Sequence, residues 1–405
     1  MSTDRLVEHF FRHEYGRLVA TLVRRVGVRH IEAVEDAAQT ALMTALETWT
    51  TGGVPDQPSA WLFRVAHNAL LGELRAQTRR ERLAAQHALP QLAPSELQND
   101  LLGMLFVCCD AAIPIESQLV LALKTLCGFD VREIAARLFL SEANVYKRLA
   151  RARTRLRESP PGPAELTHEE RRARLPALQA VLYVLFTEGY LSSDHEVPLR
   201  RELCEEAIRL ATLLAEEPVG QTPETFALLA LMHLHAARMS ARADASGGLL
   251  LLEEQDRSRW NTHQIQEGLF WLAKSASGEQ FSRYHAEAGI AAEHCLAASL
   301  EETRWDKIEE CYALLEQLAP SPLHRLNRAL AVAQQRGAAA GLAVLAGLEP
   351  PSWLAGSYAW AAVFADLHRR AGHRELAQRY RAIALESAPT PALKTLLQRR
   401  LGADG

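Results

Sequence analysis

Apolar residues recur at three- and four-residue spacing along almost the whole chain, and strand-like alternation is nearly absent. This period places apolar side chains on one face of an α-helix. Alanine, leucine, glutamate and arginine dominate the segments that carry it. The pattern predicts an all-α fold.

Proline and glycine divide this pattern into blocks. Breaks fall at 52–58, around Pro90 and Pro94, and at 159–164, where the sequence SerProProGlyProAla cannot continue a helix. We therefore expect a helical domain at 1–85, a linker at 86–97, a second helical domain at 98–158 and a long helical array at 168–405.

Further turns are expected within the array near 218–223, 245–248, 320–322 and 350–351. A tail segment, Gly372-x4-Ala377-x2-Tyr380-x3-Ala384-x4-Pro389, has small residues where paired helices would need close contact. It resembles a tetratricopeptide unit, although no clean 34-residue period runs through the region. The prediction is a degenerate helical-repeat, tetratricopeptide-like C-terminal domain.

The composition is that of a globular protein: 405 residues, 48% hydrophobic and 23% charged. It excludes collagen-like, disordered and disulfide-scaffold classes. No window approaches the roughly 18 apolar residues of a membrane span, and the first 30 residues lack the apolar core of a signal peptide. The six cysteines form no CxxC pair, which favours reduced thiols in a cytoplasmic protein without membrane contact.

The best-resolved local signal lies at 131–157. A first helix at about 132–139 is followed by Ser141, a residue type that caps a second helix. Residues 141–157 carry six basic side chains and one acidic side chain. One apolar stripe consists of Val145, Leu149, Ala152 and Leu156, and a separate polar stripe consists of Asn144, Arg148, Arg151 and Arg155. The arrangement predicts a DNA-binding helix-turn-helix, with an amphipathic helix and a solvated arginine face as the alternative.

A second signal lies upstream. The helix expected at 30–49 carries Glu35, Asp36 and Gln39 on one side. After the 52–58 loop, a further helix has aromatic residues near its start, at Trp61 and Phe63, and arginines at its end. Basic residues beside aromatic ones suit melted DNA, while the competing interpretation is that both aromatic rings belong to the core.

In this order, the two signals resemble a bacterial RNA polymerase sigma factor of the extracytoplasmic-function group. The segments that carry the resemblance are Glu35-Asp36-x-x-Gln39, Ala60-Trp61-Leu62-x-Arg64-x-Ala66-x-Asn68, Glu133-Ile134-Ala135 and Arg148-Leu149-x-Arg151-Ala152-Arg153-x-x-Leu156. They are similar, in turn, to the polymerase-binding helix of region 2, the helix that reads the −10 element, and the region 4 helix-turn-helix that reads the −35 element.

The resemblance implies partners and sites. The partners are core RNA polymerase, contacted by Glu35, Asp36 and Gln39, and promoter DNA. The implied −10 contacts are Trp61, Arg64, His67, Asn68, Arg75, Arg79 and Arg80. The −35 contacts are Ser141, Glu142, Asn144, Lys147, Arg148, Arg151 and Arg155.

The long C-terminal part resembles the extension of one class of these factors, in which it is thought to regulate the sigma part. Asp256, Arg257, Arg259 and Trp260 are its candidate regulatory residues, through a partner or through contact with the sigma domains. The competing explanation is helix capping by Asp256 or Asn261, with Trp260 buried. Whether the extension activates or inhibits stays open, as does the oligomeric state.

Enzyme motifs are not found. The chain lacks a phosphate-binding glycine loop, HExxH, GxSxG and usable metal-ligand spacing, so no catalytic residue, metal or cofactor is expected. The alternative function is a one-component helix-turn-helix regulator with a ligand- or partner-binding helical domain. That alternative leaves residues 30–80 without a role.

Overall fold

The computed structural model describes residues 3–80, 94–158, 166–192, 199–244, 248–278 and 280–402, and at 3–13, 76–80 and 94–100 the backbone alone is considered. Throughout these ranges the regular elements are helices, and an isolated bridge between Ala243 and Leu249 is the only β-type pairing. The all-α prediction is therefore confirmed.

The chain divides into two compact units, residues 1–185 and 186–405. The helix α8, His168–Tyr190, begins in the first unit and ends in the second. The sequence-based boundary at residue 168 thus falls at the start of a helix that contributes to both units.

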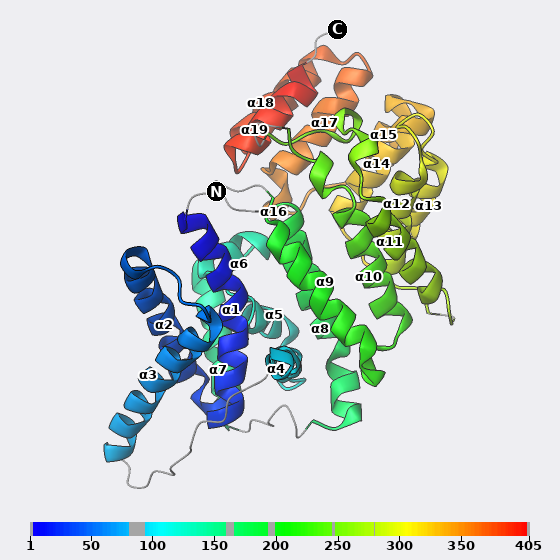
Figure 1. Cartoon of the computed structure of the whole chain (residues 1–405). Helices are drawn as coiled ribbons and strands as arrows, with labels where there is room; N and C mark the ends of the chain where they lie inside the picture. The colour runs from blue at the N-terminus through cyan, green and yellow to red at the C-terminus, as the bar shows by residue number, and fades with distance from the viewer. Residues whose placement is uncertain are drawn as a thin grey trace. The chain divides into compact units, whose positions relative to one another are not determined.

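The first unit contains the helices that carry both sequence signals (Figure 1). They are α1 (Thr3–Val26), the 3-10 turn η1 (Val28–His30), α2 (Ile31–Gly52), α3 (Pro58–Arg80), α4 (Pro94–Cys108), α5 (Ile115–Thr125), α6 (Val131–Arg137) and α7 (Glu142–Glu158). The helix α4 begins inside the linker expected at 86–97, and residues 86–93 of that linker lie outside the described residues.

Two groups of helices make up this unit, and they share a core. The helices α1, α2 and α3 pack on one another around Leu22, Val34 and Leu62, which are buried. The helices α5, α6 and α7 pack around buried residues that include Leu121 and Val145. The two groups meet because α1 also packs on α4, and α5 packs on both α4 and α7.

The two groups approach closely at Gly16 of α1. A Cβ atom built at this position would lie 2.0 Å from the carbonyl oxygen of Leu126, which follows α5. Because real Cβ atoms never come so close, the packing of α1 against the end of α5 requires glycine here.

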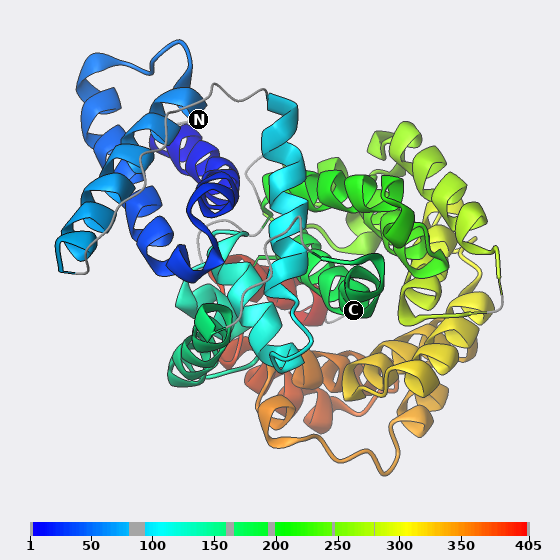
Figure 2. The ribbon, with the colours of Figure 1, turned by 90° about the horizontal axis from the view of Figure 1, so that it is seen from below.

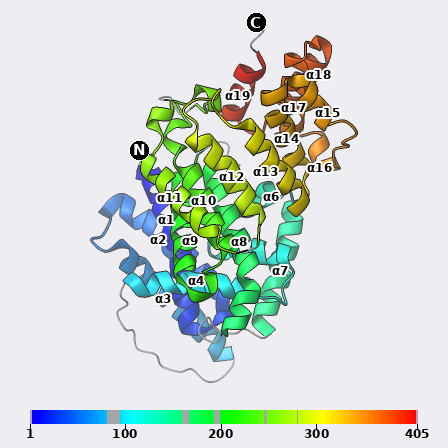
Figure 3. The ribbon, with the colours of Figure 1, turned by 90° about the vertical axis from the view of Figure 1, so that its right-hand side faces the viewer.

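The second unit is a succession of helices and short 3-10 turns in which neighbours along the chain pack together. After α8, its α-helices are α9 (Arg201–Glu216), α10 (Pro223–Ala236), α11 (Thr262–Ser275), α12 (Arg283–Leu296), α13 (Trp305–Leu318), α14 (Pro322–Arg336), α15 (Ala338–Val344), α16 (Ser352–Ala355), α17 (Tyr358–Arg370), α18 (Arg374–Glu386) and α19 (Pro391–Gly402). Its 3-10 turns are η2 (Pro218–Gly220), η3 (Met239–Ala241), η4 (Leu252–Glu254) and η5 (Arg257–Arg259). Figures 2 and 3 show α10 to α15 following one another as a layered array of helices.

The tail of this array contains the helix pair that the small-residue pattern predicts. The helices α17 and α18 form a hairpin whose turn contains Gly372 at φ 79°, a conformation that favours glycine. Tyr380 of α18 stacks on Phe364 of α17, with ring centroids 5.1 Å apart. The last helix, α19, contacts the segment that precedes η5. Arg399 of α19 donates to the carbonyl oxygen of Leu249 and pairs with Glu254 at 3.1 Å.

Two further sequence-based expectations concern membranes and cysteines. Across the described residues, we find no helix with the length and apolarity to span a bilayer. All six cysteines are free thiols, and four of them are buried. Burial raises the pKa of the Cys109 thiol to about 12, so the neutral thiol persists at physiological pH.

Candidate nucleic-acid and protein interfaces

The helix-turn-helix at 130–158 is built by local hydrogen bonds. Asp130 caps α6, because its Oδ1 accepts from the backbone N–H of Glu133 at 2.7 Å while Glu133 Oε2 accepts from the N–H of Asp130 at 2.7 Å. Ser141 caps α7 through a hydrogen bond from the N–H of Asn144 to its Oγ, 3.3 Å long. The predicted capping role of Ser141 is confirmed.

The turn between α6 and α7 contains an unusual backbone conformation. Phe139 has φ 53°, in the left-handed region, where a bulky side chain is strained. Its side chain is largely exposed.

The two faces of α7 are separated as the sequence pattern predicts. The apolar stripe of Val145, Leu149, Ala152 and Leu156 is buried. Of the predicted −35 contacts, Ser141, Glu142, Asn144, Lys147 and Arg151 are exposed, and Arg148 and Arg155 are half-buried. The exposed Tyr146 lies among them and was not predicted. The face can therefore present guanidinium, amide, hydroxyl and phenol groups to a DNA groove.

The outer face of α2 mixes polar and apolar groups. The predicted polymerase contacts Asp36 and Gln39 are exposed on it. One and two turns further along the helix, Met43 and Leu46 are also exposed, Met43 to 64%. We call these four residues the α2 outer face. Sequence reasoning missed its apolar half, although the spacing of 36, 39, 43 and 46 is helical.

Glu35, the third predicted polymerase contact, lies elsewhere. Its side chain is buried, with 4% of the residue exposed. Glu35 Oε1 accepts a 2.6 Å hydrogen bond from Thr125 Oγ1 of α5, and Glu35 Oε2 accepts from Arg153 Nη2 of α7. A neighbouring and more exposed ion pair joins Arg157 to Glu32 at 3.0 Å. We call these interactions the α2–α7 contact.

Burial raises the pKa of the Glu35 carboxyl, and the positive charge of Arg153 and the Thr125 hydroxyl oppose that rise. The carboxylate is thus held by partners supplied from both α5 and α7. In this arrangement the Glu35 side chain is buried and does not share the exposed face of Asp36 and Gln39.

The predicted −10 residues of α3 divide in a similar way. Arg64, Asn68 and Arg75 are exposed. Trp61 is half-buried against Trp49, with ring centroids 5.4 Å apart. The side chains of the predicted contacts Arg79 and Arg80, at the end of α3, lie outside the described residues.

His67 is buried on the inner side of α3, so its predicted role as a direct −10 contact does not fit this arrangement. Its ring lies 5.8 Å from that of Phe63, and the Arg25 guanidinium lies 4.7 Å from the Phe63 ring centroid. Burial and the charge of Arg25 lower the pKa of His67, which keeps the ring neutral. Phe63 is half-buried between Arg25 and His67, as the core interpretation of this ring expects.

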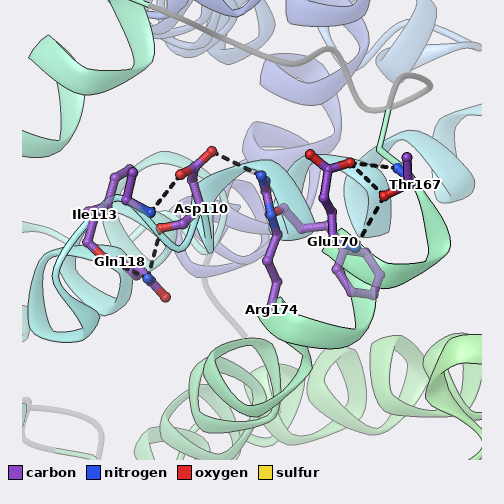
Figure 4. Close-up of polar contacts among 8 residues, drawn as sticks. Asp110, Ile113, Gln118, Thr167, Glu170 and Arg174 are labelled. Carbon is purple, nitrogen blue, oxygen red and sulfur yellow. Dashed lines mark hydrogen bonds and ion pairs between the residues drawn. The ribbon is translucent and has the colours of Figure 1, made fainter.

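The start of α8 is fixed to α4 within the first unit (Figure 4). Arg174 donates to Asp110 Oδ2 at 2.9 Å and to the carbonyl oxygen of Phe106 at 3.1 Å. Both charged residues are buried. Asp110 in turn accepts from the N–H of Ala112 at 2.8 Å, and its carbonyl oxygen accepts from Gln118 Nε2 at 2.8 Å.

The cluster at 256–260 follows the capping interpretation. Asp256 Oδ1 accepts from the N–H of Ser258 at 3.0 Å, and Asn261 caps α11. Trp260 is buried, and Arg257 donates to two backbone carbonyl groups. Arg259 is exposed and donates to the carbonyl oxygen of Ser240 at 2.9 Å. Three of the four candidate residues are thus engaged within the second unit, and Trp260 is not accessible to a partner protein.

No group of three or more His, Cys, Asp or Glu side chains within the described ranges is arranged to hold a metal ion. The predicted DNA-facing residues, by contrast, stand on two helices of one unit. The fold and these faces define an all-helical, DNA-binding transcription protein with an additional helical domain.

Comparison with known families specifies that class. The sequence model of Sigma-70 region 2 matches residues 11–80, and that of Sigma-70, region 4 matches residues 106–156. The chain belongs to the sigma-70 family: it is a sigma factor that binds core RNA polymerase and promoter DNA and directs promoter-specific transcription. Sigma factors are not enzymes, and family membership supports the same conclusion for this chain.

Two further matches extend beyond these two regions. Residues 174–276 match a Family of unknown function (DUF6596). The chain is also 35% identical over 328 residues to an uncharacterized protein of Rhizobium meliloti (strain 1021), covering 78% of this chain and 77% of that protein. No solved structure matches the chain.

Proposed function

We propose that this sigma factor belongs to the extracytoplasmic-function group, reads the −35 element with α7 and the −10 element with α3, and docks on core polymerase through the α2 outer face. We further propose that its C-terminal domain controls its activity, and that it acts in the cytoplasm, where the polymerase is. The observation that carries the proposal is the division of α7 into a buried apolar stripe and an outward basic face.

For α7, the position along the helix assigns the roles. Asn144, Lys147 and Arg148 lie in its first two turns, the part of a recognition helix that reaches base edges in the major groove. Arg151 and Arg155 lie further along, where guanidinium groups meet phosphates. Loss of a base contact costs about 1–3 kcal/mol and relaxes specificity at one base pair, whereas loss of a phosphate contact weakens all sequences alike.

In vitro transcription with core polymerase tests this division. Templates that differ at single −35 base pairs are compared for Arg148→Ala and Arg151→Ala. We expect the first variant to tolerate substitutions at one position and the second to lose activity on every template. Arg172→Ala, which removes an exposed arginine from α8, is the matched control. Wild-type discrimination and activity in both variants would rule out the proposed role of α7.

For the α2 outer face, the chemistry is that of a protein-binding surface. Exposed Met and Leu beside polar groups supply the apolar centre of an interface, and Asp36 and Gln39 supply its polar contacts. We expect Met43→Ser with Leu46→Ser to weaken the binding of core polymerase at least tenfold without altering the fold.

The measurement is a titration of labelled full-length chain with core polymerase. Leu376→Ser, which removes a large exposed apolar side chain from α18, is the control and should bind like the wild type. Equal affinity of the Met43/Leu46 variant and the control would show that polymerase docks elsewhere.

For the C-terminal domain, the ion pair between Arg174 and Asp110 decides where a truncated chain should end. A chain that ends at Ser159 loses Arg174 and leaves the Asp110 carboxylate buried without its cationic partner. A chain that ends at Tyr190 keeps that ion pair and removes the helices from α9 onward. Comparing the two separates control by the second unit from simple damage to the first.

Promoter-specific transcription is measured for the full chain and for the chain ending at Tyr190. Higher activity of the truncated chain means that the C-terminal domain inhibits, and loss of activity means that it is required. Equal activity contradicts the proposed control.

The alternative of a one-component regulator is distinguished by DNA binding alone. Such a regulator footprints duplex DNA without polymerase, whereas a sigma factor needs the polymerase for stable binding. The region 2 match at residues 11–80 favours the sigma factor, because it gives this segment a role that the alternative lacks.

A further inference from the structure

Two arginines of the second unit lie against one indole ring, and a third lies against a neighbouring tyrosine. The guanidinium carbon of Arg238 lies 5.1 Å from the centroid of the Trp260 ring, and that of Arg257 lies 4.7 Å from it. Arg242, one helical turn after Arg238, places its guanidinium 3.6 Å from the ring of Tyr190. We call Arg238, Arg242, Arg257 and Trp260 the arginine–tryptophan cluster.

None of the three arginines forms an ion pair with a carboxylate of the described residues. Their partners are neutral: Arg238 reaches Gln255 Oε1 at 3.4 Å, and Arg242 donates to the carbonyl oxygen of Tyr190. Arg257 donates to the carbonyl oxygens of His294 and Ala297, each at 2.7 Å. This contrasts with Arg174 in the first unit, which is buried against Asp110.

The cluster also has unused hydrogen-bond donors. Arg238 Nε, Arg257 Nη2 and Trp260 Nε1 are buried and have no partner in the described structure. Arg238 as a whole is 8% exposed and Trp260 is 5% exposed. Buried donors normally have partners, and a donor left without one destabilises the fold.

The positive charges of the three arginines also lack a negatively charged partner in the part of the chain that the structure describes. A guanidinium group stays protonated under all physiological conditions, so it cannot escape burial by losing its proton. The nearby histidines, which can lose a proton, are kept neutral by the same surroundings. Burial, together with the charge of neighbouring arginines, lowers the pKa values of His235 and His294 to about 3. The region is thus positively charged, with no acid of the described residues paired to the arginines.

We propose that the arginine–tryptophan cluster is a binding site for the oxyanion group, carboxylate or phosphate, of a small molecule. A guanidinium presents parallel N–H donors that match two oxygens of such a group. The Nε of Arg238, the Nη2 of Arg257 and the indole N–H of Trp260 belong to adjacent groups and supply the donors. A bound oxyanion would supply both a negative charge for the guanidinium groups and acceptors for the donors without partners.

The proposed site lies in the part of the chain whose function is not assigned. All four residues lie within 174–276, the segment that matches a family of unknown function. The site is outside the helices that we assign to DNA and polymerase, so the proposal stands independently of those assignments. It would give the C-terminal domain a small-molecule ligand.

Equilibrium dialysis of the full chain tests the site directly. Labelled inorganic phosphate and labelled succinate are used separately, at constant ionic strength in chloride. We expect saturable binding of one anion per chain, and at least tenfold weaker binding to Arg238→Gln. Arg336→Gln, which removes an exposed arginine that pairs with Glu309, is the control and should bind as the wild type does.

Binding of phosphate alone or of succinate alone supports the proposal and identifies the source of the oxyanion. Absence of saturable binding for both probes overturns it, as does binding that Arg238→Gln leaves unchanged. Thermal unfolding without added anion gives a second readout: because Arg238→Gln removes an unpaired buried charge, its midpoint should equal or exceed that of the wild type. If Arg238→Gln does not fold, Trp260→Phe, which keeps an aromatic ring but removes the N–H donor, must show the weakened binding instead.

Discussion

Replacing Arg153 by methionine leaves the Glu35 carboxylate buried without its cationic partner. The methionine keeps much of the side-chain length and adds no new charge to α7. The same helix offers a matched control, Arg157→Met, because Arg157 pairs with Glu32 at 3.0 Å where both side chains are about half exposed, 50% and 45%. The two variants remove the same group from the same α2–α7 contact at two different depths.

The expected magnitudes differ because of that depth. Removing one partner of a buried ion pair destabilises by about 3–5 kcal/mol, whereas an exposed pair contributes about 0–1 kcal/mol. A change of about 3 kcal/mol corresponds to a factor of roughly 150 in the equilibrium between closed and open forms of the contact, at 1.4 kcal/mol per tenfold. Glu35→Gln combined with Arg153→Met should recover part of the loss, since no buried charge remains.

Hydrogen exchange of the full chain is the assay, read on peptides from α2 and α7. We expect Arg153→Met to accelerate exchange in both helices and Arg157→Met to change it little. If Glu35 docks on the polymerase after the contact opens, Arg153→Met should also bind core polymerase more tightly. Equal exchange in Arg153→Met, Arg157→Met and the wild type would refute the assignment of Arg153 as the partner that keeps Glu35 buried.

A second substitution, in α1, tests how the two groups of helices in the first unit pack together. Gly16→Ala places a Cβ atom where the Leu126 carbonyl oxygen lies 2.0 Å away, so α1 and the end of α5 must separate. We expect Gly16→Ala to accelerate hydrogen exchange in α1 and α5. Gly72→Ala, on α3 with open space around its Cβ position, is the control and should leave the pattern unchanged.

Three other predictions concern single groups. Arg174→Met should destabilise the first unit by about 3–5 kcal/mol, because Asp110 stays buried and charged, and hydrogen exchange in α4 and α8 measures the loss. Phe139→Gly should stabilise the helix-turn-helix by about 1 kcal/mol by relieving the left-handed backbone, as read from urea unfolding, and a lower stability would contradict that reasoning. His235 and His294 are held neutral in the folded state, so their contribution to stability is complete above pH 6.5 and is lost as the pH falls from 6.5 towards 3; the unfolding temperature of the full chain should fall over this window, and less so in a His235→Asn variant.

Local sequence patterns determine much of this protein. The helix-turn-helix can be predicted from residues 130–158 because its signals are all short-range. They are the Asp130 and Ser141 caps and the period that buries Val145 and Leu149. The same holds for the all-α class and for the hairpin around Gly372, whose φ requires a glycine.

Tertiary structure decides which of the patterned residues remain accessible. Glu35 and Asp36 are neighbours on α2, yet one is buried and the other exposed, because Arg153 arrives from 118 residues away along the chain. Arg174 reaches Asp110 across 64 residues in the same way. No local period encodes such meetings, since they depend on how separate helices pack.

The arginine–tryptophan cluster shows both contributions. The sequence by itself marks Arg257 and Trp260 as a polar and aromatic group, but it does not connect them to Arg238, which precedes them by about 20 residues and several turns. Packing brings the two guanidinium groups to the same indole ring and leaves carboxylates out of the pairing. The sequence specifies residue types and helical faces. Tertiary packing determines which groups surround the arginines of this cluster, and therefore that their charges are unpaired.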